Sequence, residues 1–373
     1  MKKIAFLSGT RADFGKLKSL IQAVQKDAEF EYGIFATGMH LLEKYGMTVI
    51  EIEKAGFKNI HRFKNHTSEA TMDLTLAKTI EGFSAYVKEF KPDLIVVHGD
   101  RVEALAGAIV GSLNNILVGH IEGGELSGTV DELIRHSVSK LSHIHFVSNK
   151  TAARRLVQMG ELESSIFTVG SADLDVLFSS ELPTLETVKT YYDISFDKYA
   201  VVLYHPVTTD FSNTKLNAKQ FVNSLLQDDS KYIVIFPNND LGSTEILEEY
   251  DKLKDNPRFR IFPSLRFEYF ITLLKNAKFL IGNSSAGIHE APYLGIPTIN
   301  IGRRQENRDL HTDTIIHVPN SLNAILNGIE TAKNLQINPK KRKSTQKAAT
   351  LFLQTLHSEE IWKIDQQKQF RDI

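Results

Sequence analysis

The chain has 373 residues, of which 42% are hydrophobic and 24% are charged, and its formal net charge is -1. This ordinary globular composition excludes a disordered or membrane-embedded chain, and the near-neutral charge provides no global field to hold nucleic acid or an anionic membrane. There are no cysteines, which excludes disulfides, thiolate metal sites and cysteine nucleophiles.

The length predicts two domains, because a domain usually has roughly 100 to 200 residues. The first residues, MKKIAFLS, carry two lysines, but the apolar run that follows them is shorter than the roughly 7 to 15 residues of a signal peptide. We therefore expect a first strand in a cytoplasmic protein.

The first half of the chain alternates apolar runs of strand length with segments of helical period. The runs cover residues 3–8, 32–37, 93–99, 115–121 and 143–148. Strands that are apolar throughout and separated by helices indicate a parallel sheet covered on both faces. This half is therefore expected to be Rossmann-like.

The same pattern starts again after Gly170, and the runs cover residues 200–206, 232–238, 259–263, 279–284 and 297–302. A polar stretch with Pro183 separates the two halves and suits an interdomain connection. We predict an α/β protein with two doubly wound parallel-sheet domains that face a cleft. The first spans residues 1–175, with a carboxyl-terminal helix at 357–373 packed back on it, and the second spans residues 176–356.

Ligands of such sheets bind at the carboxyl ends of the strands, and charged motifs lie there. The segment HIEGGELSGTVDELIRHSVSK, residues 120–140, combines four carboxylates, two imidazoles and an arginine with three glycines that allow tight turns. We interpret this segment as catalytic.

The preceding strand ends in HGDR and supplies Asp100. Adjacent parallel strands would bring Asp100 and Glu122 into one site, where one carboxylate acts as base and the other as acid. The alternative for Asp100 is an N-cap of the next helix.

A strand-to-helix turn of the first domain, SGTRADFGK, places Arg11 and Lys16 beside a helix start, where a phosphate can bind. The turn lacks the GxGxxG dinucleotide fingerprint, and the alternative is a glycine turn with a surface arginine. The second domain has a similar turn, GNSSAGIHEAP, at residues 282–292. It suits a diphosphate, with Glu290 placed for ribose hydroxyls, and the alternative is a plain N-capped helix.

Three further features belong to the second half. His205 ends the first strand of that half, where it either faces the cleft or is a structural histidine. Arg303, Arg304 and Arg308 follow the last run and suit a phosphate or leaving-group contact, or else form a solvated loop. Phe270 offers a ring to a base, although an aromatic residue at helical spacing is more often part of the core.

Two other features are interpreted as structural. His143 and His145 alternate on a strand, but two histidines alone are a weak metal signal, so we expect no metal. The basic run at residues 339–343 is interpreted as a solvated loop in a chain of near-zero charge.

Five motifs in order resemble the hydrolysing UDP-N-acetylglucosamine 2-epimerases, especially the bacterial enzymes that begin sialic acid synthesis. They are GTRADFGKLK, TGMHL, HGDRVEALAG, HIEGGELSGTVDELIRHSVSKLSHIHF and GNSSAGIHEAP, within residues 1 to about 310. The resemblance implies the glycosyltransferase-B fold, no cofactor, a homodimer or homotetramer, and no nucleic-acid or membrane partner. It implies conversion of UDP-N-acetylglucosamine and water into N-acetylmannosamine and UDP, by elimination to 2-acetamidoglucal and then hydration.

The resemblance also implies which residues form the site. The catalytic residues are expected to be Asp100, Glu122, Asp131 and His205. The substrate-binding residues are expected to be Arg11, Lys16, His40, Arg101, His120, Asn238, Phe270, Ser284, Ser285, Gly287, Glu290, Arg304 and Arg308, with Phe270 at the uracil. As a hypothesis, Asp100 and Glu122 exchange protons with carbon 2 and water, while Asp131 positions or tunes them.

Three alternatives to this function stay open. The first is the same chemistry on UDP-N,N'-diacetylbacillosamine, and the second is a glycosyltransferase of the same architecture. The third is a non-enzymatic nucleotide-sugar sensor, against which the three cleft carboxylates argue, because buried unpaired charge is destabilising unless it has a use.

Overall fold

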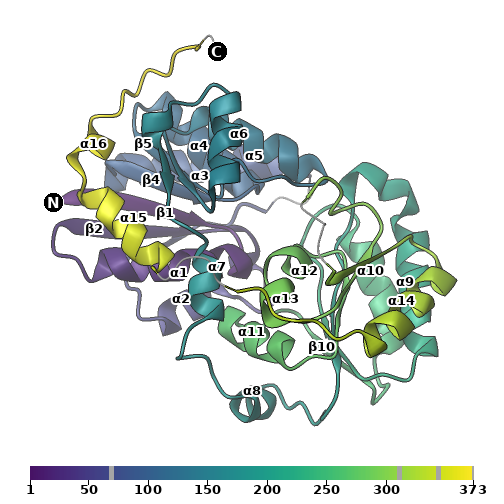
Figure 1. The fold of residues 1–373 in the computed structure, drawn as a ribbon. Helices are drawn as coiled ribbons and strands as arrows, with labels where there is room; N and C mark the ends of the chain where they lie inside the picture. Colours follow the sequence, from purple (N-terminus) through teal and green to yellow (C-terminus); the bar gives the residue numbers. More distant parts are fainter. Residues whose placement is uncertain (67–70, 309–312, 342–345, 372–373) are drawn as a thin grey trace. The chain divides into compact units, whose positions relative to one another are not determined.

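The computed structural model describes residues 1–66, 71–308, 313–341 and 346–371. It divides into two compact units, each an α/β assembly around a parallel sheet (Figure 1). Unit 1 contains residues 1–125 and 131–176 and the described carboxyl-terminal residues 346–371. Unit 2 contains residues 126–130 and the described residues from 177 to 341.

Within the described part of unit 1, seven parallel strands form a sheet in the order β3-β2-β1-β4-β5-β6-β7. The strands are β1 (Lys2–Ser8), β2 (Phe30–Ala36), β3 (Ile60–Arg62), β4 (Leu94–His98), β5 (Leu117–Ile121), β6 (Ile144–Val147) and β7 (Ile166–Thr168). The strand order reverses between β1 and β4, which makes the carboxyl ends of these strands the expected ligand-binding edge.

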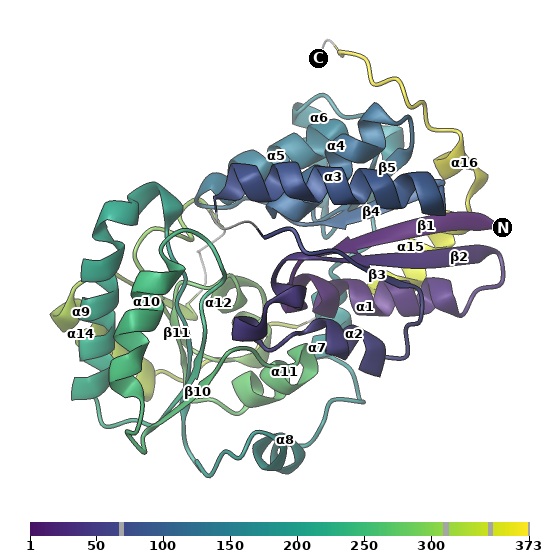
Figure 2. The ribbon, with the colours of Figure 1, turned by 180° about the vertical axis from the view of Figure 1, so that it is seen from behind.

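Helices cover both faces of this sheet. They are α1 (Arg11–Gln25), α2 (Val49–Lys54), α3 (Met72–Phe90), α4 (Val102–Leu113), α5 (Val130–Leu141), α6 (Lys150–Gln158), α7 (Ala172–Leu177), α15 (Ala348–His357) and α16 (Glu359–Trp362), with short 3₁₀ helices at Gly38–Leu41, Glu43–Tyr45 and Glu163–Ser165. Figure 2 shows α1 and α15 on one face of the sheet and α3 and α4 on the other.

The carboxyl-terminal helix α15 completes the core of unit 1. Its Phe352 is fully buried and packs against Phe6 of β1 and Phe146 of β6, with ring centroids 6.5 and 4.7 Å apart. Burial of such a ring is among the larger contributions that one side chain makes to stability. The helix that packs back on unit 1 is therefore Ala348–His357, and the predicted helix at 357–373 is replaced by the single turn Glu359–Trp362 and non-helical chain up to residue 371.

Within the described part of unit 2, six parallel strands follow the order β10-β9-β8-β11-β12-β13. They are β8 (Ala200–Leu203), β9 (Tyr232–Ile235), β10 (Phe259–Phe262), β11 (Leu280–Gly282), β12 (Thr298–Ile301) and β13 (Ile315–Val318). The order reverses between β8 and β11, so this unit has the same doubly wound design as unit 1.

The helices of unit 2 also form two layers. One layer packs on the sheet with α9 (Thr214–Gln227), α10 (Ser243–Tyr250) and α14 (Leu322–Asn334). The other contains α8 (Leu185–Tyr191), α11 (Phe267–Lys275), α12 (Ala286–His289) and α13 (Ala291–Leu294). Short 3₁₀ helices lie at Thr208–Asn213 and Asp251–Leu253.

The predicted α/β class with two parallel sheets is confirmed. The apolar runs correctly predict the central strands, but three edge strands, β3, β7 and β13, have no such run and escape the prediction. Each has only three or four residues, and none of these residues is fully buried, since an edge strand packs against fewer neighbours. Among the described residues, no helix has the length and apolar character needed to cross a bilayer.

Candidate active site

The charged groups of unit 1 gather where β4 and β5 end. The two strands pair in register, with His98 opposite Ile121, so the residues that follow them emerge at the same edge of the sheet. Asp100 and Glu122 follow these two strands. The prediction that neighbouring strand ends bring these carboxylates to one edge is therefore confirmed at the level of the backbone.

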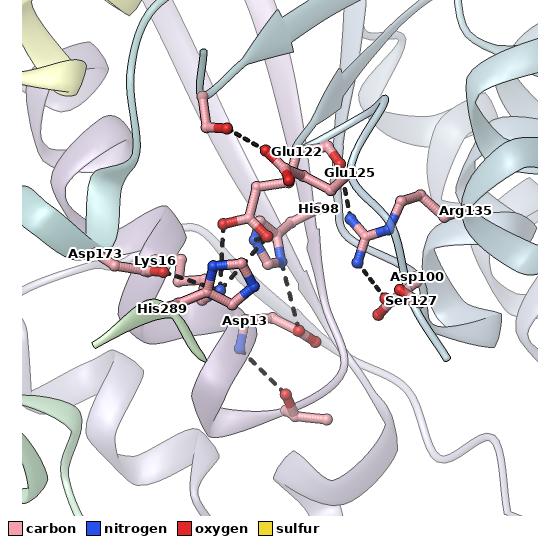
Figure 3. Close-up of polar contacts among 12 residues, drawn as sticks. Asp13, Lys16, His98, Asp100, Glu122, Glu125, Ser127, Arg135, Asp173 and His289 are labelled. Carbon is pink, nitrogen blue, oxygen red and sulfur yellow. Dashed lines mark hydrogen bonds and ion pairs between the residues drawn. The ribbon is translucent and has the colours of Figure 1, made fainter. Parts of the chain in front are cut away.

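Glu122 has an unusual backbone conformation, with φ 64° in the left-handed region that residues other than glycine rarely adopt. Strain of this kind typically costs about 1 to 3 kcal/mol and persists where the surroundings enforce it. The carboxylate accepts a hydrogen bond from Lys16 Nζ at 3.2 Å and lies 3.3 Å from His98 Nε2 (Figure 3). The strained turn therefore aims Glu122 at two cationic groups.

His98 is protonated at neutral pH in this arrangement. Burial alone lowers the pKa of its imidazole, but the Glu122 charge and the contact with Asp13 outweigh burial and raise the pKa to about 9. The Asp13 Oδ1 to His98 Nδ1 distance is 3.6 Å. Burial raises the pKa of Asp13, but the close contact with His98 and the charge of His98 outweigh burial, so the pKa of Asp13 is lowered. His98 is thus a fixed cation beside Glu122.

Lys16 lies between two carboxylates. Its Nζ is 3.2 Å from Glu122 Oε1 and 3.0 Å from Asp173 Oδ2. The Asp173 side chain is 3% exposed, and Asp173 belongs to none of the sequence motifs. This position favours a role for Lys16 in the carboxylate cluster over the expected phosphate contact.

Arg135 of α5 is the second centre of the site, and it is 4% exposed. Its Nη2 donates to the Asp100 carboxylate, and its Nη1 donates to the main-chain oxygen of Glu122 at 2.7 Å (Figure 3). Burial lowers the pKa of Arg135, but Asp100, Glu122, Glu125 and Asp131 together outweigh burial and raise it. The charges of the three predicted catalytic carboxylates therefore act on one buried arginine, to which the sequence analysis gives no role.

The alternative for Asp100, an N-cap of α4, is wrong. The N-cap position of α4 is Arg101, and no side chain caps that end of the helix. The Asp100 carboxylate pairs with Arg135 instead. Arg101 Nε lies 3.9 Å from the carboxylate of Glu103, which is 1% exposed, so Arg101 takes part in a neighbouring ion pair.

Two histidines that were expected to bind substrate are fully buried. Both ring nitrogens of His40 bond to side-chain hydroxyl groups at 2.9 and 2.8 Å, and burial lowers its pKa to about 4. His120 Nε2 bonds the carbonyl oxygen of Gly99 at 2.8 Å and Nδ1 bonds Ser139 Oγ at 3.1 Å. Because a carbonyl only accepts, Nε2 carries the proton. These contacts favour structural roles for both histidines. His120 holds the turn that precedes Asp100.

His143 and His145 also have structural partners. His143 Nδ1 accepts from Val118 N at 3.0 Å, and His145 Nε2 lies 2.9 Å from a Glu161 carboxylate oxygen. Within the ranges that the structure describes, no group of three or more histidine or acidic side chains is arranged to hold a metal ion.

In unit 2, His205 follows β8 at the point where the strand order reverses. Its main-chain N and O form a pair of hydrogen bonds with the Asn283 side chain, at 2.7 and 2.8 Å. Its Nδ1 accepts from the main-chain N of Asn238 at 3.1 Å. A neutral His205 ring therefore carries its proton on Nε2 and can act there as a hydrogen-bond donor.

Asn283 organises this edge of unit 2, and the sequence analysis did not single it out. It is 1% exposed and follows β11. Its main-chain oxygen accepts from Arg304 Nη1 at 3.3 Å and from Gln305 Nε2 at 2.7 Å. Asn283 thus joins the ends of β8 and β11 to the arginine loop. Its place directly after a strand, inside the GNSSAG motif, is the sequence signal that could have identified it.

The expected diphosphate turn is followed by a short helix. The helix α12 has only four residues, so its macrodipole is small, and Ser284 Oγ accepts a main-chain N–H in a local turn at 3.3 Å. Ser285 is the N-cap residue but makes no side-chain cap bond. A Cβ at Gly287 would lie 2.4 Å from Thr298 Cγ2, so glycine allows α12 to pack on β12. Glu290 is 4% exposed.

The remaining predicted residues differ in their surroundings. Phe270 is 8% exposed within an apolar cluster, which favours its alternative role in the core. Arg308 Nη1 lies 3.1 Å from His289 Nε2, and Asn238 Nδ2 donates to Asp240. Arg11 is half-buried in the first turn of α1.

The family model described as UDP-N-acetylglucosamine 2-epimerase matches residues 22–364 of this chain. The chain belongs to this family. A UDP-N-acetylglucosamine 2-epimerase of Neisseria meningitidis serogroup B is 44% identical over 377 residues, which cover 100% of both chains. A hydrolysing UDP-N,N'-diacetylbacillosamine 2-epimerase of Legionella pneumophila is 35% identical, over 90% of this chain and 89% of that protein.

Solved structures of 2-epimerases share the fold of this chain. The Methanocaldococcus jannaschii UDP-GlcNAc 2-epimerase, in complex with UDP-GlcNAc and UDP, superposes with a TM-score of 0.80 at 24% identity. The comparison covers 95% of this chain and 99% of that one. A Neisseria meningitidis UDP-GlcNAc 2-epimerase bound to UDP-GlcNAc gives a TM-score of 0.77 at 17% identity, with 95% of this chain and 99% of that chain covered. The chain has the glycosyltransferase-B fold of these proteins.

Proposed function

We propose that this protein is a hydrolysing 2-epimerase that converts UDP-N-acetylglucosamine and water into N-acetylmannosamine and UDP. The observation that carries the proposal is the Glu122 carboxylate at the end of β5, held by His98 and Lys16, in a member of the 2-epimerase family. The 44% identity to the Neisseria meningitidis epimerase along the whole chain supports the same substrate.

The chemistry explains why such a site needs carboxylates. The hydrogen on carbon 2 of the sugar is not acidic, so a carboxylate can remove it only as the bond from carbon 1 to the UDP oxygen breaks. The electron pair of the C–H bond forms the double bond between carbons 1 and 2, and the pair of the C–O bond leaves with UDP. The product is 2-acetamidoglucal.

Hydration of this intermediate completes the reaction. Water adds its hydroxyl group to carbon 1, and a proton is delivered to carbon 2 on the face opposite to the first abstraction. Each general acid or base step of this type is typically worth ~10²- to 10⁴-fold in rate. In the proposed mechanism, Glu122 and Asp100 exchange these protons, and Arg135 fixes the position of both.

The cationic groups around Glu122 give it the properties of such a base. The protonated His98 and Lys16 stabilise the Glu122 carboxylate, so it stays ionised until carbon 2 becomes acidic. Asp131 acts at longer range, through the charge of Arg135. In this proposal, unit 2 binds the uridine diphosphate, with the Nε2 of His205 and with Arg304 and Arg308 as donors to its developing charge.

The hydrolysing outcome has support from other relatives. The Legionella pneumophila and Campylobacter jejuni bacillosamine 2-epimerases, each 35% identical to this chain, are named as hydrolysing enzymes. The polysialic acid biosynthesis protein P7 of Escherichia coli is 33% identical over 90% of this chain. We therefore propose that the N-acetylmannosamine serves sialic acid synthesis, and that the enzyme works as a homodimer or homotetramer.

A second candidate function is the same reaction on UDP-N,N'-diacetylbacillosamine. The two relatives that are 35% identical are named for that substrate. The carboxylate cluster is compatible with either sugar, because the chemistry takes place at carbons 1 and 2 and the sugars differ elsewhere on the ring.

One experiment distinguishes these functions. The protein is incubated in deuterated water with UDP-N-acetylglucosamine and, separately, with UDP-N,N'-diacetylbacillosamine, and the products are identified by NMR. Free N-acetylmannosamine with deuterium at carbon 2 is expected. UDP-N-acetylmannosamine as the final product would contradict hydrolysis, and conversion of the bacillosamine sugar alone would establish the second candidate.

The role of Glu122 is tested by Glu122→Gln, which keeps the size of the side chain and removes the base. Sugar release should be abolished, while UDP binding, measured by calorimetry, is kept. The matched control is Glu132→Gln, since Glu132 is a half-buried carboxylate of the same segment that is paired with His136 at 3.3 Å. Near-normal turnover of Glu122→Gln would reject the assignment.

A further inference from the structure

Asp173 is a buried carboxyl group that the proposed mechanism does not use. It lies in the first turn of α7 and is 3% exposed. Its Oδ2 lies 3.0 Å from Lys16 Nζ, and its buried Oδ1 has no hydrogen-bond partner among the described residues (Figure 3). A buried polar atom without a partner is destabilising, so its presence indicates a function that outweighs this loss.

Asp173 ends a line of groups whose charges alternate in sign. Asp13, His98, Glu122, Lys16 and Asp173 follow one another, with successive atoms 3.6, 3.3, 3.2 and 3.0 Å apart. They come from α1, the ends of β4 and β5, and α7. Each of the two cationic groups in this line therefore lies between two carboxyl groups.

The pKa values of the carboxyl groups at the two ends of the line shift in opposite directions. Burial raises the pKa of Asp173, the Glu122 charge raises it further, and Lys16 and His98 oppose them without cancelling the effect. The pKa of Asp13, at the other end, is lowered because His98 is its direct partner.

We propose that Asp173 is a positioning residue for the epimerisation. Its carboxylate holds the Lys16 ammonium group against the Glu122 carboxylate. It also gives Lys16 an anionic partner while Glu122 carries a proton. The inference rests on the proposed function. When Glu122 takes the proton from carbon 2, its negative charge disappears and Lys16 loses that partner. The Asp173 carboxylate then balances Lys16 and keeps it in place for the return of the proton.

A neighbouring residue offers a matched comparison. Asp175 lies on the same helix, and its Oδ2 accepts a hydrogen bond from the main-chain N of Ala349 at 3.1 Å. This contact fastens α15 to unit 1, which is a structural role. Replacement of Asp175 should therefore destabilise the protein, whereas replacement of Asp173 should not.

The first test measures stability and needs no enzyme activity. Because the pKa of Asp173 is higher in the folded than in the unfolded protein, its ionised form destabilises the fold above the unfolded pKa of about 3.8. Asp173→Asn has no such charge, so its thermal unfolding temperature at pH 7 should be at or above that of the wild type. Asp175→Asn should unfold at a lower temperature. An unfolding temperature of Asp173→Asn below the wild type would overturn the proposal.

The second test measures kinetics, with UDP-N-acetylglucosamine as substrate. Asp173→Asn should lower kcat about 10- to 100-fold through misplacement of Lys16, with little change in KM. The acid limb of its kcat profile should move to lower pH, because Lys16 then acts on Glu122 alone. Unchanged kcat and pH profile would overturn the proposal.

A double-mutant cycle separates positioning from an independent effect. In a Lys16→Met background, Asp173→Asn should cause no further loss of kcat, because Asp173 acts through Lys16. If the loss of kcat in the double variant equals the product of the losses in the two single variants, the proposal is overturned. If the wild type itself releases no sugar, the proposed function fails, and the stability comparison still decides whether Asp173 has a merely structural role.

Discussion

Replacing Arg135 by methionine should disable the carboxylate cluster while every carboxylate stays in the chain. The variant keeps an unbranched side chain of similar length but loses both donors, one to the Asp100 carboxylate and one to the main-chain oxygen of Glu122. Asp100 would then lack its cationic partner. The strained backbone at Glu122 would lose one of the contacts that enforce it.

The expected loss of stability follows from the burial of the pair. Removing one partner of a buried ion pair typically costs about 3 to 5 kcal/mol, because the other charge stays buried without compensation. The side chains of Arg135 and Asp100 are 5% and 18% exposed, so some water reaches the carboxylate. We therefore expect a loss of about 3 kcal/mol, at the lower end of that range. Displacement of Asp100 and Glu122 should lower kcat about 100-fold.

Urea unfolding and steady-state kinetics test this prediction. In the double variant Asp100→Asn with Arg135→Met, the Asp100 charge is removed together with its direct partner, so part of the stability should return while activity stays low. Arg155→Met is the control, since Arg155 donates to the carbonyl oxygen of Gly124 at 3.2 Å, and it should lose only about 1 kcal/mol. A free energy of unfolding for Arg135→Met within about 1 kcal/mol of the wild type would refute the reasoning.

Three further predictions concern stability. The pKa of His98 is raised from 6.5 to about 9, so its stabilising contribution is present below pH 6.5 and disappears as pH rises through about 9. NMR titration of the histidines should show this pKa, and Glu122→Gln should lower it; an unchanged value would contradict the assigned cause. The contacts of Glu161 with a histidine and two lysines outweigh burial and lower its pKa from 4.5 to about 2. The free energy of unfolding of Glu161→Gln should therefore be a few kcal/mol lower than that of the wild type at pH 7. Urea unfolding should show that this difference shrinks as the pH falls from about 4.5 toward 2. Gly282→Ala would place a Cβ 1.9 Å from a main-chain oxygen of β8 and should prevent folding of unit 2, whereas Gly160→Ala, also at positive φ but in open space, should cost about 1 kcal/mol by thermal unfolding.

The sequence allowed correct prediction of those parts of the fold that local pattern encodes. A central strand of a parallel sheet is buried on both faces, so it must be apolar throughout, and β1, β4 and β8 are visible as apolar runs. The edge strands β3, β7 and β13 have no such requirement, and their pairing depends on the neighbour that they meet. The same limit applies to α15, whose burial depends on Phe6 and Phe146 far away in the chain.

For the candidate site, the sequence indicated where charged residues gather but not which of them meet. Asp100 and Glu122 follow adjacent strands, so their common edge was predictable. Lys16 was expected at a phosphate, yet it lies beside Glu122 and Asp173, from which it is separated by 106 and 157 residues. No local rule relates such positions, because the direction of a side chain depends on the packing of the elements that carry it.

The sequence by itself determined the doubly wound α/β class, the strand ends at which chemistry is expected, and the family. Only the tertiary structure decided that Arg135 pairs with Asp100, that His40 and His120 are buried between bonding partners, and that Asp173 faces Lys16. The physical reason is that apolar periodicity is a property of each segment. The ionisation and position of a buried charge instead depend on every other charge that folding brings within a few ångströms.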